Sequence, residues 1–389
     1  MQIKRLFRLR ALSIVTLLLI AALNQPAFAS GDSTKIQLEK KLASEKQTEI
    51  IVQYKKTLLF QEKKFSNSID SRIKEREGMG NGLEIIRAKD TGQVSGLLEE
   101  LRKNNDILYA EKNKLLSINE RPNDPFYENQ WGLGAIMAES AWDMLLPYQA
   151  RVVTVGIIDT GIEKTHPDLA SRIAPGGYNF ILNSSDVYDI NGHGTGVAGV
   201  IAAETGNGAG IAGVTGRLNV KILPLQAASY KGYAYVSDVI KAIDYAIEKG
   251  VDVLNLSMGS SSFSDIENEA IQRAVQSGIV VVASAGNEGT QEFSYPASFD
   301  NVISVGSVAK DITISSFSNH NDRVDLVAPG EDIYTTGLDN SYSSYYGTSF
   351  AAPMVAGIAS AIKATDPTLT PAEIASIIKD TTADKGAPG

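Results

Sequence analysis

The spacing of apolar residues changes near Pro122 and divides the sequence into two regions. After Pro122, short continuous apolar runs such as 152–158 and 279–283 predict strands that are buried on both faces. Apolar residues three and four apart predict helices between such runs, over 236–249 and 265–277. Strands that alternate with helices predict an α/β fold, a parallel sheet with helices on both faces. In such sheets, functional sites form at the carboxyl ends of the strands. Further strands are expected at 220–223, 251–256 and 302–305.

The region before Pro122 predicts a smaller unit. Strands are expected at 49–54, 83–87 and 107–111, with helices around 60–78 and 92–104. This β-α-β-α-β order predicts a small α+β sandwich, close to the ferredoxin-like pattern. Residues 30–121 hold 18 basic and 15 acidic side chains and few glycines. The composition alone is also compatible with a separate binding domain.

The N-terminus predicts a secretory signal over residues 1–29. Four basic residues precede an apolar core at 11–22, and Ala27-Phe28-Ala29 forms a small-residue cleavage site. The alternative is a membrane anchor, but a bilayer takes about 20 apolar residues. No later stretch is long and apolar enough to span one. We therefore expect a secreted, extracellular protein without stable membrane association.

Composition and charge exclude several kinds of chemistry. The 389 residues contain no cysteine, which excludes thiol proteases, thiolate zinc sites, iron–sulfur clusters and disulfides. A net charge of −9 argues against nucleic acid as the main partner. Residues 208–213 match the G-x-G-x-x-G pattern, but a dinucleotide fingerprint follows a strand and opens a helix, whereas these follow a helix. Any imidazole chemistry must use His166, His193 or His320.

Four short motifs hold residues suited to catalysis. Asp159 ends a predicted strand, where it could act in catalysis or cap a turn, and His193 lies among glycines at a helix start. Ser349 begins another helix, where free N–H groups and the helix dipole stabilise a developing oxyanion. Pro353 is expected in the first turn of that helix, which places the start close to Ser349. Asn287 follows an apolar strand and can donate its side-chain N–H to a tetrahedral intermediate.

These motifs occur in the order Asp, His, Asn, Ser, and 122–389 resembles the subtilisin-like serine proteases of the thermitase-like bacterial type. The resemblance implies that Ser349 is the nucleophile and His193 the general base and then acid. It implies that Asp159 orients the imidazole and Asn287 donates to the oxyanion. The matching segments are Ile158-Asp-Thr-Gly161, His193-Gly-Thr195, Ala285-Gly-Asn287 and Gly347-Thr-Ser-Phe-Ala-Ala-Pro353.

One position departs from the family pattern. A second histidine usually stands three residues after the catalytic one, and here that residue is Gly196. The position is not part of the triad, so the change bears on local packing. Some lanthipeptide leader peptidases also lack this histidine, which leaves a dedicated leader-processing protease open as an alternative. A peptide-binding pseudoprotease is a second alternative, although all four catalytic positions are filled.

The resemblance also implies roles for the two regions. Residues 30–121 are then a propeptide that assists folding, inhibits the enzyme and is removed by self-cleavage between about Lys112 and Arg121. Residues 122–389 are then the peptidase domain, with 14 basic and 30 acidic residues and a net charge of −16. A monomer that acts on proteins or peptides is expected. The family usually continues with a closing helix after 369–379, so a chain that ends at Gly389 is either a fragment or lacks that element.

The resemblance further implies a structural Ca²⁺ ion. Hard oxygen ligands of mixed kind suit this ion, and the alternative is a glycine-rich turn without metal. His166 is then structural, and His320 is expected to be exposed without a role. The implied ligands are the side chains of Asp124, Asp168 and Asn207 and the backbone oxygens of Glu204, Ala209 and Ile211.

Substrate is expected to bind as an extended strand through backbone hydrogen bonds. Small residues around the first pocket predict that it is roomy and mainly apolar. The residues matched to the outer subsites are Lys231, Gly232 and Tyr233, and those matched to the first pocket are Ser257, Met258, Gly259, Ser284, Ala285 and Gly286.

Overall fold

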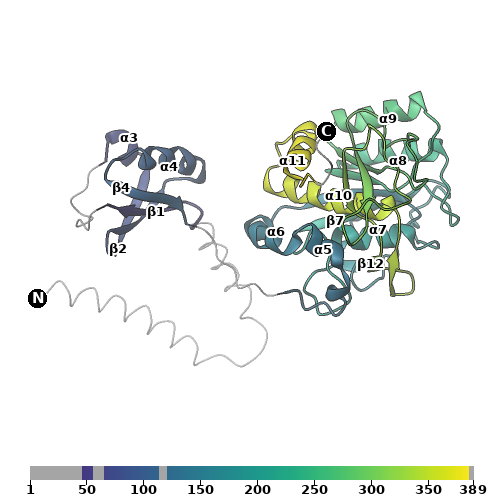
Figure 1. Cartoon of the computed structure of the whole chain (residues 1–389), viewed down its shortest axis with the longest axis horizontal. Coiled ribbons are helices and arrows are strands. Elements are labelled where there is room, and N and C mark those ends of the chain that lie inside the picture. Colours follow the sequence, from purple (N-terminus) through teal and green to yellow (C-terminus); the bar gives the residue numbers. More distant parts are fainter. Residues whose placement is uncertain (1–45, 56–64, 114–120, 385–389) are drawn as a thin grey trace, which may run out of the picture. The chain divides into compact units, whose positions relative to one another are not determined.

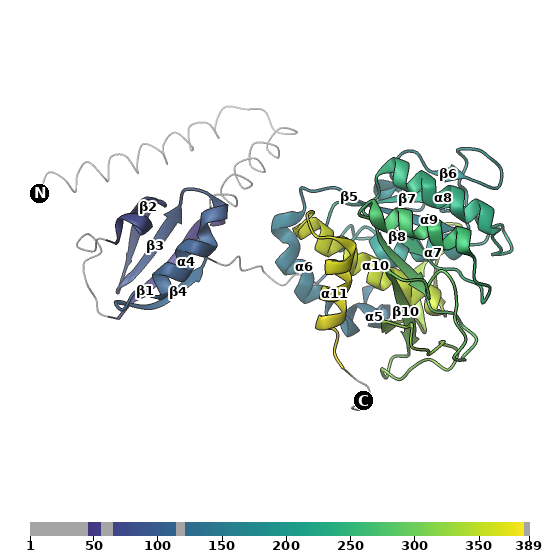
Figure 2. The same ribbon diagram turned by 90° about the horizontal axis from the view of Figure 1, so that it is seen from above.

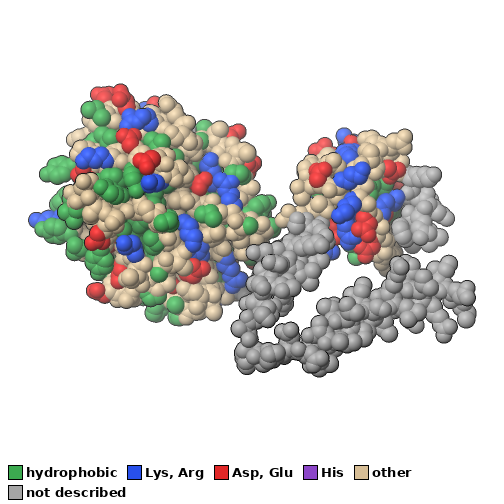
Figure 3. All heavy atoms as spheres, turned by 180° about the vertical axis from the view of Figure 1, so that it is seen from behind, with side chains coloured by type: hydrophobic (Ala, Val, Ile, Leu, Met, Phe, Trp, Pro, Cys, Tyr) green, Lys and Arg blue, Asp and Glu red, His purple; other side chains and the backbone are tan. Residues whose placement is uncertain are grey.

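The computed structural model describes residues 46–55, 65–113 and 121–384, which belong to two compact units. The predicted signal peptide lies outside the described residues, as does most of the predicted cleavage region. Among the described helices, none is both long and apolar enough to cross a membrane. On the face drawn in Figure 3, basic and acidic side chains are interspersed over both units.

The small unit is a four-stranded antiparallel sheet in the order β2-β3-β1-β4, with α4 packed against it (Figure 2). The order along the chain is β-α-β-β-α-β, the ferredoxin-like arrangement, in agreement with the expected α+β sandwich. Its elements are β1 (Glu49–Tyr54), α3 (Asn67–Asp70), β2 (Ile73–Gly80), β3 (Leu83–Ala88), η2 (Thr91–Gln93), α4 (Val94–Arg102) and β4 (Ile107–Lys112).

Of the helix predicted around 60–78, residues 60–64 lie outside the described residues and 67–70 form α3, but the prediction is wrong over 73–78, which belong to strand β2. Lys, Glu and Arg favour a helix locally, but pairing with β3 overrides this preference. Arg87 pairs across the strands with Glu75 at 2.7 Å and Glu77 at 3.0 Å. Asn81 has a φ of +52° and stands between two glycines of positive φ, a combination that closes the hairpin.

The large unit is built on a seven-stranded parallel sheet with helices on both faces, as predicted (Figure 1). The strand order is β11-β10-β9-β8-β5-β7-β6. The strands are β5 (Val153–Asp159), β6 (Tyr178–Asn179), β7 (Val220–Gln226), β8 (Val253–Leu256), β9 (Val280–Ser284), β10 (Val302–Val308) and β11 (Leu326–Pro329), with a separate antiparallel pair, β12 (Ile333–Thr336) and β13 (Tyr342–Tyr345).

Successive side chains of β5 enter two different cores, because strand side chains alternate between the faces of a sheet. Val155 and Ile157 pack with α7 and α10, whereas Ile158 packs with α8 and α9. The helices are α5 (Trp131–Ala135), α6 (Ala138–Leu145), α7 (His193–Ala202), α8 (Val236–Lys249), α9 (Asp265–Gln276), α10 (Thr348–Thr365) and α11 (Pro371–Thr381), with short 3-10 turns η3 (Tyr127–Asn129), η4 (Leu146–Tyr148) and η5 (Ala170–Arg172).

Candidate active site

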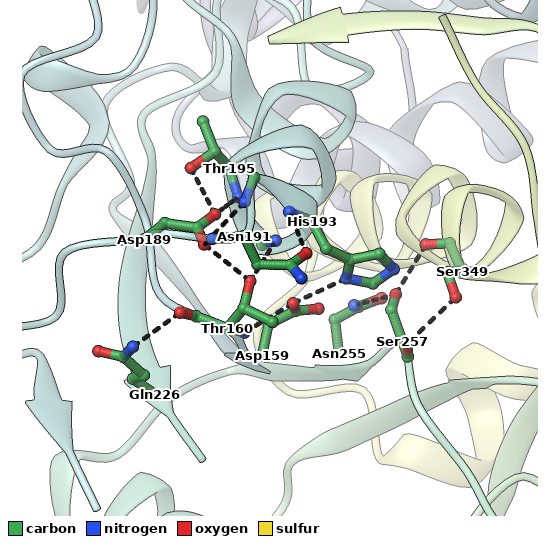
Figure 4. Close-up of polar contacts among 12 residues, drawn as sticks. Asp159, Thr160, Asp189, Asn191, His193, Thr195, Gln226, Asn255, Ser257 and Ser349 are labelled. Atoms are coloured by element: carbon green, nitrogen blue, oxygen red, sulfur yellow. Dashed lines mark hydrogen bonds and ion pairs between the residues drawn. The ribbon is translucent and has the colours of Figure 1, made fainter. Parts of the chain in front are cut away.

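Asp159 and His193 form a hydrogen-bonded pair at the carboxyl edge of the sheet. Asp159 is the last residue of β5 and is buried, and His193 is the first residue of α7. The Nδ1 atom of His193 lies 2.7 Å from Oδ1 of Asp159 (Figure 4). An ionised carboxylate only accepts hydrogen bonds, so Nδ1 carries the proton and Nε2 is left to accept one.

Opposing effects act on the His193 imidazole. Burial alone lowers the pKa of His193, but the charge and hydrogen bond of Asp159, with the charge of Asp189, more than offset this. The pKa of His193 is therefore raised above its ordinary value. The carboxylates thus stabilise the protonated imidazole.

Asp189 holds the segment that leads into α7. Its Oδ1 accepts the hydroxyl of Thr160 and the backbone N–H of Gly192, each at 2.9 Å. Its Oδ2 accepts both the backbone N–H (3.0 Å) and the hydroxyl (2.8 Å) of Thr195. Asp189 was not predicted from the sequence. The available signal was an acidic residue four positions before a glycine-flanked histidine at a helix start.

Ser349 is the second residue of α10 and is largely buried. Its hydroxyl donates to the backbone carbonyl of Ser257, which follows β8, at 3.1 Å. In Figure 4 the His193 imidazole lies between Asp159 and Ser349. The three predicted triad residues therefore come together from one strand end and two helix starts.

The position of Pro353 corrects one prediction. Helix α10 begins at Thr348, as expected, but Pro353 lies inside it and not in the first turn. Because proline lacks an N–H, the carbonyl of Ser349 loses its helical partner. The hydroxyl of Ser257 donates to that carbonyl instead (2.8 Å), and Asn255 donates to the same hydroxyl (2.9 Å). The proline thus leaves the Ser349 carbonyl to be linked to β8 through the hydrogen bonds of Ser257 and Asn255.

Asn287 presents its amide group at the same edge. Its Oδ1 accepts both the backbone N–H (2.8 Å) and the hydroxyl (2.9 Å) of the buried Thr348. With the oxygen fixed toward Thr348, the Nδ2 atom has no acceptor among the described residues and can donate to another group. Thr348 was not predicted from the sequence, although it directly precedes the predicted nucleophile.

The space beside Gly196 is filled by Phe350. A Cβ atom at position 196 would lie 3.0 Å from Cε1 of Phe350. The buried Phe350 ring packs edge-on to the His193 imidazole, with 5.4 Å between centroids, and stacks on Tyr345 at 4.8 Å. The departure from the family pattern is therefore accommodated by an aromatic ring that contacts His193.

The two acidic residues of the predicted calcium site converge on one loop. Asp124 and Asp168 are both buried. Asp124 accepts the backbone N–H of Gly206 at 2.8 Å, and Asp168 accepts the Asn207 side chain and the Ile211 backbone, each at 2.8 Å. Burial and the charge of Asp168 raise the pKa of Asp124, although hydrogen bonds from the loop lower it.

Neutral oxygens complete the predicted set. The Glu204 side chain pairs with Arg172 at 2.9 Å, so only the backbone oxygen of Glu204 remains as a candidate ligand. Ala209 donates its N–H to the Asn207 side chain at 2.7 Å. Within the described ranges, no group of three or more His, Cys, Asp or Glu side chains is arranged to hold a metal. A cation here would depend on two carboxylates and neutral oxygens.

The predicted substrate segments line the same edge. Ser257 is buried, Met258 is half-buried and Gly259 is exposed, directly after β8. Ser294 was not predicted, and its Oγ lies directly against the position that a Cβ atom of Gly259 would take. Ser294 therefore places a hydroxyl beside Gly259, one of the residues predicted for the first pocket. Ser284, the last residue of β9, and Ala285 are buried, and Gly286 is half-buried. Lys231, Gly232 and Tyr233 are exposed at a turn closed by the Ser229–Tyr233 hydrogen bond.

The other two histidines match their predictions. His166 is fully buried, accepts the N–H of Asp168 at 3.2 Å and packs against Tyr342, an environment expected of a histidine with a structural role. His320 is exposed. The G-x-G-x-x-G match at 208–213 lies in the loop between α7 and β7, unlike a dinucleotide site.

Comparison with known proteins identifies the family. The subtilase family profile matches residues 150–389. A thermophilic serine proteinase of Bacillus sp. strain AK1 is 36% identical over 90% of this chain and 86% of its own length. Thermitase of Thermoactinomyces vulgaris is 39% identical over 61% and 84%. A solved protease of Pseudoalteromonas arctica superimposes with a TM-score of 0.63 at 32% identity, covering 68% of this chain and 93% of its own. The chain therefore belongs to the subtilase family and is a serine endopeptidase.

Proposed function

We propose that Ser349 is the nucleophile of this endopeptidase, activated by His193. Nε2 of His193 takes the hydroxyl proton while Oγ of Ser349 forms a bond to the substrate carbonyl carbon. The imidazolium then gives that proton to the leaving amine as the peptide bond breaks. Water attacks the acyl-enzyme by the same route and releases the acid. The observation that carries this assignment is the 2.7 Å contact between Asp159 and His193 beside Ser349.

The resting hydrogen bond of Ser349 defines a step before attack. Its hydroxyl donates to the carbonyl of Ser257, so the side chain must rotate to donate to Nε2 of His193. This rotation frees the Ser257 carbonyl to accept a backbone N–H from an extended substrate. The Asn287 amide, oriented by Thr348, donates to the oxyanion that forms on the substrate carbonyl.

The small unit fits the role of a propeptide that this enzyme removes itself. Its size, its ferredoxin-like order and its place before the peptidase domain support this proposal. A predicted signal peptide at 1–29 supports secretion as an extracellular enzyme, and we propose that this enzyme acts as a monomer. Ser349→Ala tests self-processing directly. The wild-type chain is expected to mature by cleavage between about residues 112 and 121, whereas pure Ser349→Ala protein keeps the full prosegment. Maturation of that variant would refute self-processing.

Ca²⁺ fits the residues that converge on the loop 204–211. Asp124 and Asp168 are buried close enough that the charge of Asp168 raises the pKa of Asp124, and a divalent cation would offset this repulsion. Carboxylate, amide and carbonyl oxygens are the donors that Ca²⁺ prefers. When bound, the ion supplies stability to the loop and takes no part in peptide hydrolysis.

Substrate breadth separates a general endopeptidase from the leader-processing alternative. We expect the processed enzyme to degrade casein and to cleave several unrelated peptides. Cleavage restricted to one peptide sequence would favour the dedicated processing role. Binding without hydrolysis of any peptide would favour a pseudoprotease.

A further inference from the structure

Glu267 is a buried carboxylate for which the described residues supply no partner. It lies in the first turn of α9 and is 6% exposed. Among the described residues, none forms an ion pair or hydrogen bond with its carboxylate, and burial raises the pKa of Glu267. The two carboxylate oxygens are not completely enclosed, so solvent can reach the group.

Glu267 does not complete the capping box that its position in α9 predicts. Ser264 and Glu267 have the spacing of a capping box, in which the glutamate accepts the backbone N–H of the capping residue. Thr370 and Glu373 form such a box completely, with Glu373 accepting the Thr370 N–H at 2.8 Å. In α9 only one half forms, the hydrogen bond from the N–H of Glu267 to the Ser264 hydroxyl. The Glu267 carboxylate is instead on the buried face of the helix.

The neighbouring acidic residues differ from Glu267. Asp238 pairs with Lys241 at 2.8 Å, and Asp244 pairs with Arg273 at 2.7 Å. Glu269, two residues further along α9, is exposed to solvent. Water or a basic side chain therefore stabilises each of these charges. A largely buried carboxylate without a basic partner is unfavourable unless a cation reaches it.

The position of α9 indicates that Glu267 lies toward the edge of the sheet where substrate is expected to bind. Helices α8 and α9 pack against each other and both connect parallel strands, so they begin at the carboxyl edge of the sheet (Figure 2). Met258, in a predicted substrate segment, packs on the same core as Ile271 of α9. Glu267 shares the buried face of α9 with Ile271, one turn nearer this edge.

We propose that Glu267 is a specificity residue that accepts a lysine or arginine side chain of the substrate, located N-terminal to the scissile bond. This inference rests on the proposed proteolytic function. The negative charge of the peptidase domain, −16, also favours basic substrates. A bound basic residue supplies the cation that Glu267 lacks in the described structure.

A set of peptides that differ at one position tests this proposal. Each carries either lysine or methionine, placed in turn at the second to sixth residue before the scissile bond. For processed wild-type enzyme we expect lysine to exceed methionine in kcat/KM by about tenfold at one of these positions. Glu267→Gln is expected to abolish this preference, whereas Glu269→Gln, the matched loss of an exposed charge, keeps it.

Two outcomes would overturn the proposal: no lysine position above methionine, or an unchanged preference in Glu267→Gln. Thermal melting checks that each variant is folded, and Glu267→Met provides a second uncharged variant of similar volume. The methionine peptides separate this test from the proposed function. If they are cleaved by Glu267→Gln but not by Ser349→Ala, the triad assignment holds whichever way the lysine preference falls.

Discussion

Replacing Gly196 with alanine tests whether Phe350 holds the His193 imidazole in place. The added Cβ would stand 3.0 Å from Cε1 of Phe350 and 3.4 Å from Cγ2 of Thr335. Carbon atoms prefer separations of about 3.5–4.0 Å, so the ring must move by about half an ångström. Because the ring packs on both His193 and Tyr345, its movement displaces the imidazole.

Two opposing effects set the stability change. Overpacking a core costs about 1–3 kcal/mol. Alanine in a helix is favoured over glycine by about 1 kcal/mol. The net destabilisation is therefore about 0–2 kcal/mol. Activity is more sensitive, because a displacement of 1 Å at a catalytic group can cost about 10²-fold. We expect kcat to fall about tenfold, with a smaller change in KM.

Thermal unfolding and steady-state hydrolysis of a peptide measure both effects. Gly134→Ala is the matched control, since position 134 is also helical and has no atom within 4 Å of an added Cβ. This control should keep full activity. The double variant Gly196→Ala/Phe350→Met should recover stability, because methionine adapts to irregular space. A Gly196→Ala enzyme with unchanged kcat and a raised melting temperature would refute the packing argument.

Four further predictions follow from the site. Asn287→Ala should lower kcat by about 10²–10³-fold with little change in KM, a magnitude taken from the oxyanion asparagine of subtilisin in this same family. Thr348→Val should lower kcat about tenfold, because the Asn287 amide loses one of two hydrogen bonds that orient it. Burial lowers the pKa of His193, but Asp159 raises it by more, so the net pKa lies above the ordinary histidine value. The acidic limb of kcat/KM should therefore lie above the ordinary histidine pKa, and Asp159→Asn should move that limb to lower pH. Excess EDTA should lower the melting temperature, and an unchanged value would contradict the calcium proposal.

Continuous apolar runs and short motifs made much of the large unit predictable. Runs such as 152–158 and 279–283 correspond to β5 and β9, because strands buried on both faces need uninterrupted apolar sequence. The helix at 236–249 matches α8, whose apolar residues recur every three or four positions. The motif residues Asp159, His193 and Ser349 were identifiable because each stands at the end of an element.

Residues that act through distant partners were not predictable. Asp189 and Thr348 orient His193 and Asn287 through contacts that only the folded chain creates. Pro353 was assigned to a first turn because local rules omit the hydroxyl of Ser257, which directly follows β8. Strand β2 was taken for helix because its charged residues pair with a strand that lies further along the chain. In each case the deciding interaction joins residues of different segments, which the local sequence pattern does not contain.

Labelling with a fluorophosphonate tests the central claim most directly. The reagent reacts with a serine only where a base takes its proton and an oxyanion site stabilises the product. Intact mass and peptide mapping of the processed enzyme should show one adduct, on Ser349, and none in Ser349→Ala or His193→Ala. An enzyme that hydrolyses peptides while Ser349 stays unlabelled, or that is labelled on another serine, would contradict the account.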